Sequence, residues 1–398
     1  MRVAGVYLDW AASAPLATGS PLAAGAGNPA STHRPGRELA RQMEAARRSV
    51  AAAVRRPAEQ IAFTSGATEA NNIATLSLLT GLRTDAPGSF RRGLVHSAVE
   101  HPSVAEPGRM LARIGLPVAV AAVDADGRLD LDHFAECLDE HTRLAAVMAV
   151  NNETGAVQPV AEACAIVRAH ATRIGRPIRF HADAVQELGK VTLSPLADVD
   201  SLAISGHKLG APRGVGALIA KPGMEVLATG GGQEAGMRPG TENVDGIVAL
   251  GARAETIAAD ANGAAQTDEW AAVRELSDQL IAGAIERGLR VVPETRLDHP
   301  YHYSPFIVML SIPGLPADVL VRVMSDAGVY LSRGSACGAA RSKLSPVLVA
   351  MSVAAEVAQG AFRVSFGATT RAEEITTFFH ALDAAQAQLA PSLSAGRR

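Results

Sequence analysis

Lysine is scarce in this chain. Four of its 37 basic residues are lysines (Lys190, Lys208, Lys221 and Lys343), and the other 33 are arginines. Because a guanidinium stays charged, only the lysines can lose a proton near neutral pH and attack a carbonyl group. Lys208 stands in a polar loop between two apolar runs, where desolvation and the neighbouring His207 would lower its pKa. The sequence around Lys208 predicts either a nucleophilic amine or an idle, solvated lysine.

Cysteine is rarer still, and long apolar runs are absent. Three cysteines form neither a disulfide framework nor a CxxC pair. No stretch approaches the roughly 20 apolar residues of a membrane span, and the first residues, MRVAGVYLDW, lack the apolar core of a signal peptide. A net charge of −3 gives no general electrostatic case for nucleic acid. We expect a cytoplasmic protein without a membrane or direct nucleic-acid partner.

The pattern of apolar runs predicts an α/β fold. Expected strands lie at 3–8, 61–64, 93–96, 118–123, 144–150, 178–181, 201–204 and 214–220, and expected helices at 38–54, 69–82, 104–114, 131–140 and 161–174. This alternation indicates a mostly parallel sheet, followed by helices at 244–259 and 270–287. A second pattern, with strands at 290–292, 307–311, 329–332 and 362–366 and helices at 316–326 and 371–389, indicates a smaller α+β domain.

Candidate binding groups follow the expected strands of the large sheet. Ligands of such sheets bind beyond the carboxyl ends of the strands, where Ser65, Asn152, Asp183 and His207 fall. The Ser65–Thr68 turn before a helix suits an anion such as phosphate, or is an ordinary helix cap. Asp183 could hold a proton on a ring nitrogen, or could cap the next turn.

Three further positions carry possible chemistry. His101 could stack on a flat cofactor or be an ordinary loop histidine, and its neighbours His96 and Glu100 match no strong metal template. Cys337 lies in a Gly/Ser/Ala loop between arginines, which favours a partly ionised thiol. Arg363 stands inside an apolar strand and needs an anionic partner, either a substrate carboxylate or a structural Asp or Glu.

Seven segments occur in one order along the chain: TSGATEANN, EHPSV, NNETGAVQP, HADAVQELGK, SGHKLGAPRGVGAL, GGGQEAGMRPGTEN and SRGSACGAA. Together they resemble the cysteine desulfurases of the NifS/IscS kind, in the class V aminotransferase group of pyridoxal-phosphate enzymes. The match runs nearly end to end. The resemblance implies a fold type I architecture whose large domain, residues 14–258, holds a mostly parallel seven-stranded sheet. Residues 1–13 and 259–398 would form the small domain, with the Cys337 loop at about 333–345.

The resemblance also implies the roles of individual residues. Lys208 forms the Schiff base with pyridoxal phosphate, His101 stacks on its ring, Asp183 pairs with the ring nitrogen and Gln186 with the phenolic oxygen. Ala67, Thr68, Ser205 and His207 hold the phosphate, and Thr241 reaches it from the other subunit of a homodimer. Asn152 and Arg363 position the substrate carboxylate, and Cys337 is the nucleophile that takes sulfur from L-cysteine, leaving L-alanine. No metal ion is expected.

Some positions depart from the family pattern, and other functions stay open. Trp10, Pro239 and Arg333 stand where smaller residues or serine are usual, and Arg333 could alter the choice of sulfur acceptor. The acceptor protein is not identified, so iron–sulfur cluster assembly and tRNA thiolation are both open. The alternatives are another class V enzyme, such as a selenocysteine lyase, a β-lyase or an aminotransferase, and a non-catalytic scaffold.

Overall fold

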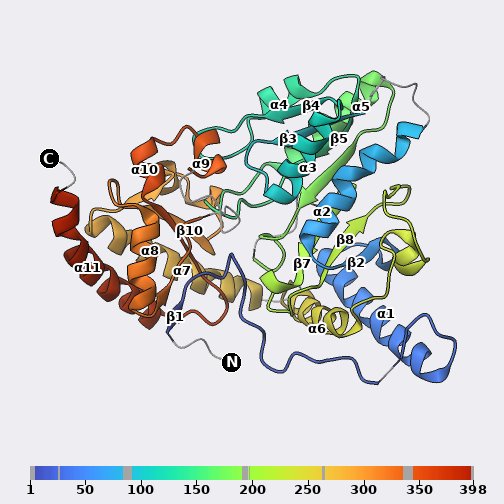
Figure 1. Cartoon of the computed structure of the whole chain (residues 1–398), viewed down its shortest axis with the longest axis horizontal. Helices are drawn as coiled ribbons and strands as arrows, with labels where there is room; N and C mark the ends of the chain where they lie inside the picture. The colour runs from blue at the N-terminus through green and yellow to red at the C-terminus, as the bar shows by residue number, and fades with distance from the viewer. Residues whose placement is uncertain are drawn as a thin grey trace.

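The structure is a computed structural model of the 398-residue chain (Figure 1). It describes residues 5–25, 27–83, 92–190, 196, 198–261, 265–334 and 344–395. None of the described helices combines the length and the apolarity needed to cross a membrane.

A seven-stranded sheet forms the larger part of the molecule. Its order is β2-β8-β7-β6-β5-β3-β4, and β8 alone runs antiparallel to its neighbours. The strands are β2 (Ile61–Thr64), β3 (Gly93–Ser97), β4 (Val118–Ala121), β5 (Thr142–Ala146), β6 (Arg179–Asp183), β7 (Ser201–Ser205) and β8 (Gly216–Ala220). The predicted mostly parallel α/β sheet is therefore confirmed.

Helices pack against this sheet because most of its strands are buried on both faces. The helices of this part are α1 (Arg34–Val54), α2 (Ala67–Leu76), α3 (Pro102–Arg113), α4 (Leu131–Cys137), α5 (Val160–Ile174) and α6 (Val244–Ala261). Helices α1 and α6 lie side by side (Figure 1). A Cβ atom on Gly251 would lie 2.5 Å from that of Ala46, so glycine permits their close approach.

A smaller sheet lies at the other end of the molecule (Figure 1). Its antiparallel strands have the order β12-β10-β9, with β9 at Arg290–Val292, β10 at Ile307–Ser311 and β12 at Ala361–Ser365. Around it lie α7 (Ala265–Glu286), α8 (Ala317–Asp326), α9 (Pro346–Ala350), α10 (Ala355–Gln359) and α11 (Ala372–Ala395).

The N-terminal segment belongs to the core of this smaller part. Strand β1 (Val6–Tyr7) pairs in parallel with β11 (Val329–Tyr330). Leu8 and Ala11 are buried in the same apolar cluster as side chains of α7, β10 and α11. The domain boundaries at residues 14–258 and at 1–13 with 259–398 stay a prediction.

Several element boundaries differ from the sequence prediction. The expected strand at 144–150 begins at Thr142 and ends at Ala146. Beyond it the amides of Val147 and Ala149 still donate to the carbonyls of His181 and Asp183, so the chain stays beside β6. Helices α9 and α10 were not predicted, because five residues are too few to show a helical period.

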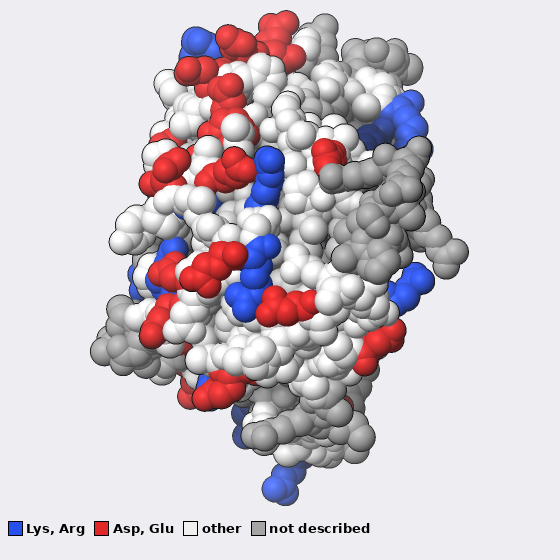
Figure 2. Space-filling view, turned by 90° about the vertical axis from the view of Figure 1, so that its left-hand side faces the viewer, with Lys and Arg blue, Asp and Glu red and all other residues white. Residues whose placement is uncertain are grey.

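Charges of both signs are mixed on the surface. On the face shown in Figure 2, acidic and basic side chains lie interspersed among wide uncharged areas. The described residues of this face form no broad basic patch of the kind that binds a nucleic-acid backbone.

Candidate active site

The candidate site lies where neighbouring strands end. Strands β6 and β7 run in parallel, with Asp183 opposite Ala203, so Asp183 and Ser205 lie at the same edge of the sheet. The short 3-10 helix η4 (Gly206–Lys208) follows β7 directly and carries Lys208 to this edge. The parallel register of β6 and β7 therefore brings Asp183 and Lys208, both singled out in the sequence, to the same edge of the sheet.

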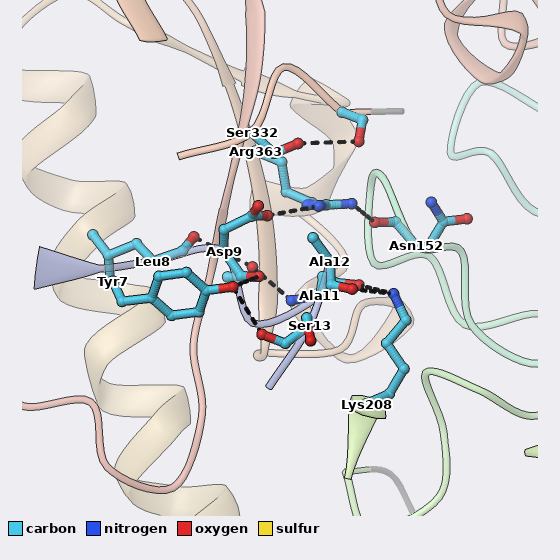
Figure 3. Close-up of polar contacts among 12 residues, drawn as sticks. Tyr7, Leu8, Asp9, Ala11, Ala12, Ser13, Asn152, Lys208, Ser332 and Arg363 are labelled. Carbon is cyan, nitrogen blue, oxygen red and sulfur yellow. Dashed lines mark hydrogen bonds and ion pairs between the residues drawn. The ribbon is translucent and has the colours of Figure 1, made fainter. Parts of the chain in front are cut away.

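The Lys208 amine faces the N-terminal segment. Its Nζ atom lies 2.6 Å from the carbonyl oxygen of Ala11 and 2.7 Å from that of Ala12 (Figure 3). The side chain is half-buried and lines a cavity with Trp10 and Lys190. Lys208 is thus not freely solvated, and its chemical role stays a prediction.

The His101 ring lies within electrostatic reach of both this amine and the Asp183 carboxylate. Burial lowers the pKa of His101, the Asp183 carboxylate opposes that shift and the Lys208 charge adds to it. Asp183 is 5% exposed. One of its oxygens, Oδ2, accepts from Nδ2 of Asn71 at 2.7 Å, and the other accepts from the Val185 amide at 3.0 Å. Asp183 therefore caps its turn, as the alternative interpretation held, and the carboxylate also faces the site.

The N-terminus of α2 lies where the sequence suggested an anion cradle. The helix begins after Gly66, and no side chain caps it. A Cβ atom on Gly66 would lie 3.7 Å from Oγ of Ser205, and Ser205 shares a hydrogen bond of 2.9 Å with Nδ1 of His207. Burial, aided by the Lys208 charge, lowers the pKa of His207 to about 4, so this ring is neutral at neutral pH. Helix amides and a hydroxyl suit a phosphate.

The residues expected to hold the cofactor phosphate differ in their exposure to solvent. Ala67 is buried at the first turn of α2, whereas Thr68 is exposed. Thr241 is also exposed, and its carbonyl accepts from Arg238. An exposed Thr241 is free to contact a second copy of the chain.

Arg363 reaches the site from the smaller sheet. Its side chain is 2% exposed and pairs with Asp9 at 2.8 Å, so a structural carboxylate is one partner of this arginine. A second nitrogen donates to the backbone oxygen of Asn152 at 2.6 Å, and the Asn152 side chain points away from the guanidinium (Figure 3). Nε of Arg363 is buried without a hydrogen-bond partner among the described residues. A buried guanidinium donor of this kind suits the carboxylate of a substrate.

Gln186 lies between one acceptor and one donor, which fix the orientation of its amide. Its Nε2 donates to the Ala11 carbonyl at 2.9 Å, and its Oε1 accepts from Lys190 at 2.8 Å. Burial, with the neighbouring Lys208 charge, lowers the pKa of Lys190 to about 7.

Cys337, the predicted nucleophile, lies outside the described residues.

Sequence reasoning missed several groups of the site. Asp9, the Ala11 and Ala12 carbonyls, Asn71 and Lys190 all contact predicted site residues. The only sequence signal for Asp9 was that Arg363 needs an anion. The backbone carbonyls carry no sequence signal.

These residues fit the cofactor that the resemblance implies. An amine, a buried carboxylate, an aromatic ring and an anion cradle are the groups that pyridoxal phosphate requires for its aldehyde, ring nitrogen, ring face and phosphate. The described residues contain no cluster of three or more His, Cys, Asp or Glu side chains that could hold a metal ion.

Known proteins resemble this chain in sequence and in fold. The profile of the family Aminotransferase class-V matches residues 6–378. A NifS/IcsS protein homolog of Lactobacillus delbrueckii subsp. bulgaricus is 34% identical over 361 residues, covering 90% of this chain and 89% of that protein. Cysteine desulfurase IscS of Dictyoglomus turgidum is 33% identical over 380 residues, covering 93% of this chain and 91% of that protein.

A solved structure agrees with these relatives. A NifS-like protein superposes with a TM-score of 0.82 and 28% identity, covering 97% of this chain and 99% of the other. The predicted fold type I architecture is therefore confirmed. The chain belongs to the class-V aminotransferase family and, within it, to the cysteine desulfurases of the NifS/IscS type.

Proposed function

We propose that this enzyme uses pyridoxal phosphate to remove sulfur from L-cysteine, giving L-alanine and a persulfide on Cys337. One observation carries the proposal: the His101 ring lies within electrostatic reach of both the Asp183 carboxylate and the Lys208 amine, which follow β6 and β7 at the same edge of the sheet. In a chain related to cysteine desulfurases, this is the set of groups that the reaction needs.

Three residues of the site have separate tasks in this reaction. When bound, pyridoxal phosphate supplies an electron sink next to the substrate Cα atom. Lys208 binds the cofactor aldehyde and then takes the Cα proton of the substrate. Asp183 holds a proton on the ring nitrogen, and Arg363 holds the substrate carboxylate with its unpaired Nε and neighbouring N–H groups.

The sulfur step balances without an external oxidant or reductant. The Cys337 thiolate attacks the sulfur of L-cysteine, forming an S–S bond while the C–S bond breaks. The electron pair of that bond remains with the three-carbon fragment, which takes up a proton at Cβ and leaves as L-alanine. Enzyme thiol and L-cysteine thus become enzyme persulfide and L-alanine.

The experiment separates this function from its alternatives. Sulfide and alanine release from L-cysteine are measured for the purified protein, for Cys337→Ala and for the control Cys164→Ala, whose thiol is buried in α5. We expect Cys337→Ala to keep the cofactor absorbance and lose sulfide release, and Cys164→Ala to keep both. Full activity of Cys337→Ala would favour another class V reaction, and a colourless protein unchanged by borohydride would favour a scaffold.

A second pair of variants tests the amine. Lys208→Ala should lose the visible absorbance of the bound aldehyde together with activity, because the proposal assigns the bond to the aldehyde to Lys208 and not to the neighbouring Lys190. Lys221→Ala is the matched control, since Lys221 is bonded to Asp198 and Asp200 at the start of β7, at the opposite end of this strand from Lys208. Loss of the absorbance in the control alone would refute the role of Lys208.

The proposal also covers the location of the protein, its oligomeric state and its sulfur acceptor. We expect a cytoplasmic homodimer in which Thr241 contacts the cofactor phosphate of the partner subunit, and a separate protein that accepts the sulfur. Light scattering of the purified protein tests the dimer, and capture of proteins by the persulfidated enzyme tests the acceptor. Neither a membrane nor direct nucleic-acid contact is part of this function.

A further inference from the structure

A continuous set of buried polar side chains lies beside Asp183 and His101. Asn71 on α2, His181 on β6 and Ser201 on β7 are each 0% exposed, and Ser103 on α3 is 5% exposed. Their hydrogen bonds connect four elements of the large sheet and its helices. Because buried polar groups must be paired, the direction of each hydrogen bond can be worked out from its neighbours.

The Asp183 carboxylate fixes the orientation of Asn71. A carboxylate only accepts hydrogen bonds, so the amide nitrogen of Asn71 must face Oδ2, 2.7 Å away. Oδ1 of Asn71 then faces Nε2 of His181 at 2.9 Å, which must carry a proton. The Ser201 hydroxyl donates to the other ring nitrogen at 2.9 Å. Burial lowers the pKa of His181 to about 4, in agreement with a neutral ring that carries one proton.

The second N–H of Asn71 fixes the direction of the next bond. It donates to Oγ of Ser103 at 2.8 Å. The Ser103 hydroxyl proton is then directed to Nδ1 of His101, also at 2.8 Å, and the Ser103 backbone amide donates to the same nitrogen at 3.1 Å. Two donors converge on Nδ1, so this nitrogen is an acceptor, and a neutral His101 ring carries its proton on Nε2.

We propose that Asn71 and Ser103 are positioning residues, which hold the Asp183 carboxylate and the His101 ring in one hydrogen-bonded unit and fix His101 in the tautomer protonated on Nε2. His101 then offers the cofactor an aromatic face and an N–H donor, and not a base. What the two groups act on depends on the proposed function, but the tautomer is a property of the chain alone.

The imidazole nitrogens report this tautomer directly. Long-range ¹H–¹⁵N spectra of protein labelled with ¹⁵N-histidine are recorded for the enzyme with pyridoxal phosphate and again after its removal, and the His101 signals are assigned with His101→Asn. We expect one neutral tautomer, with Nδ1 unprotonated. Ser103→Ala removes one of the two donors to Nδ1, which weakens the preference for the tautomer protonated on Nε2, so we expect a second tautomer to become populated beside it.

The affinity for pyridoxal phosphate is a separate readout. Loss of one neutral hydrogen bond in Ser103→Ala should weaken cofactor binding about fivefold. Asn71→Ala also removes the bond to the charged Asp183, so its effect should be about tenfold or more. The matched control is Thr75→Val, one turn further along α2, where the buried Thr75 hydroxyl has no partner among the described residues. The control should change neither tautomer nor affinity.

The outcomes separate this proposal from the proposed function. A wild-type His101 protonated on Nδ1 would overturn it, as would a Ser103→Ala protein with unchanged tautomer and affinity. If Asn71→Ala does not fold, Ser103→Ala alone decides. A wild-type protein that binds no pyridoxal phosphate would overturn the proposed function, while its imidazole spectra would still support or overturn the positioning role of Ser103.

Discussion

Glu187, the neighbour of Gln186, should make the protein less stable as the pH rises. Its side chain is 3% exposed, and its Oε2 atom has no hydrogen-bond partner among the described residues. Burial raises the pKa of this carboxyl from 4.5 to about 8. Between these two pH values the folded protein keeps a proton that the unfolded chain has lost. Stability is therefore full below pH 4.5 and falls until about pH 8.

The size of the effect follows from the width of that window. Each pH unit in it lowers the free energy of unfolding by about 1.4 kcal/mol, so the loss between pH 5 and pH 8.5 is about 4 kcal/mol. At roughly 2.1 cal/mol/K per residue, the unfolding entropy of 398 residues converts this loss to about 5 °C in Tm. Glu187→Gln keeps the shape of the side chain and removes its charge.

Thermal unfolding of both proteins at the two pH values measures this difference. At pH 5 both side chains are neutral, and we expect similar Tm values. At pH 8.5 Glu187→Gln should unfold about 5 °C higher than the wild type, relative to their difference at pH 5. Glu162→Gln, on the exposed face of α5, is the control and should show no such pH dependence. A Tm difference that is the same at both pH values would refute the reasoning.

Three other substitutions test the site and its support. Asp183→Asn should lower kcat for L-cysteine by about 10–100-fold, because an amide cannot neutralise a protonated ring nitrogen; an unchanged kcat would contradict this. Arg363→Lys loses the planar fork of donors and should raise KM for L-cysteine by about 10–100-fold with the cofactor still bound, and an effect on kcat alone would argue against carboxylate binding. Glu234→Ala removes the buried carboxylate that pairs with Arg47 at 2.7 Å and leaves only the more exposed Glu44 as its anionic partner, so it should lower stability by about 1.5–3 kcal/mol in thermal unfolding. The double variant Arg47→Leu/Glu234→Leu should recover most of that loss, and no recovery would mean that the pair acts otherwise.

The regular elements were predictable where an apolar run was bounded by turn residues. The strands at Ile61–Thr64, Arg290–Val292 and Ile307–Ser311 have the predicted bounds. Helix α1 begins at Arg34, four residues before the predicted start, because the His33 ring accepts from the amide of Gly36 and caps the first turn. A histidine cap is not among the usual sequence signals for a helix start.

The site was predictable only in part, because sequence position and chemical type identify single residues and not their partners. Lys208 and Asp183 follow apolar strands, so their place at one sheet edge could be foreseen. The partner of Arg363 could be foreseen only as some anion, since Asp9 lies 354 positions away in the sequence. The contacts of Asn71 with Asp183 likewise join α2 to β6 across 112 positions. Such pairings are set by the tertiary structure.

The N-terminal segment connects the two halves of the candidate site. Asp9 binds the Arg363 guanidinium from the smaller sheet, and the carbonyls of Ala11 and Ala12, two and three residues later, bind the Lys208 amine at the edge of the larger one (Figure 3). The amide of Ala11 in turn donates to a serine of β12 at 2.9 Å, which fixes the segment to the smaller sheet. One short stretch of chain thus supplies the acceptors of both the Arg363 guanidinium and the Lys208 amine. A shift of either sheet would therefore move the acceptors of both side chains. The distance between the Lys208 amine, proposed to take the substrate proton, and the Arg363 guanidinium, proposed to hold the substrate carboxylate, therefore depends on these few residues, and not on either sheet alone.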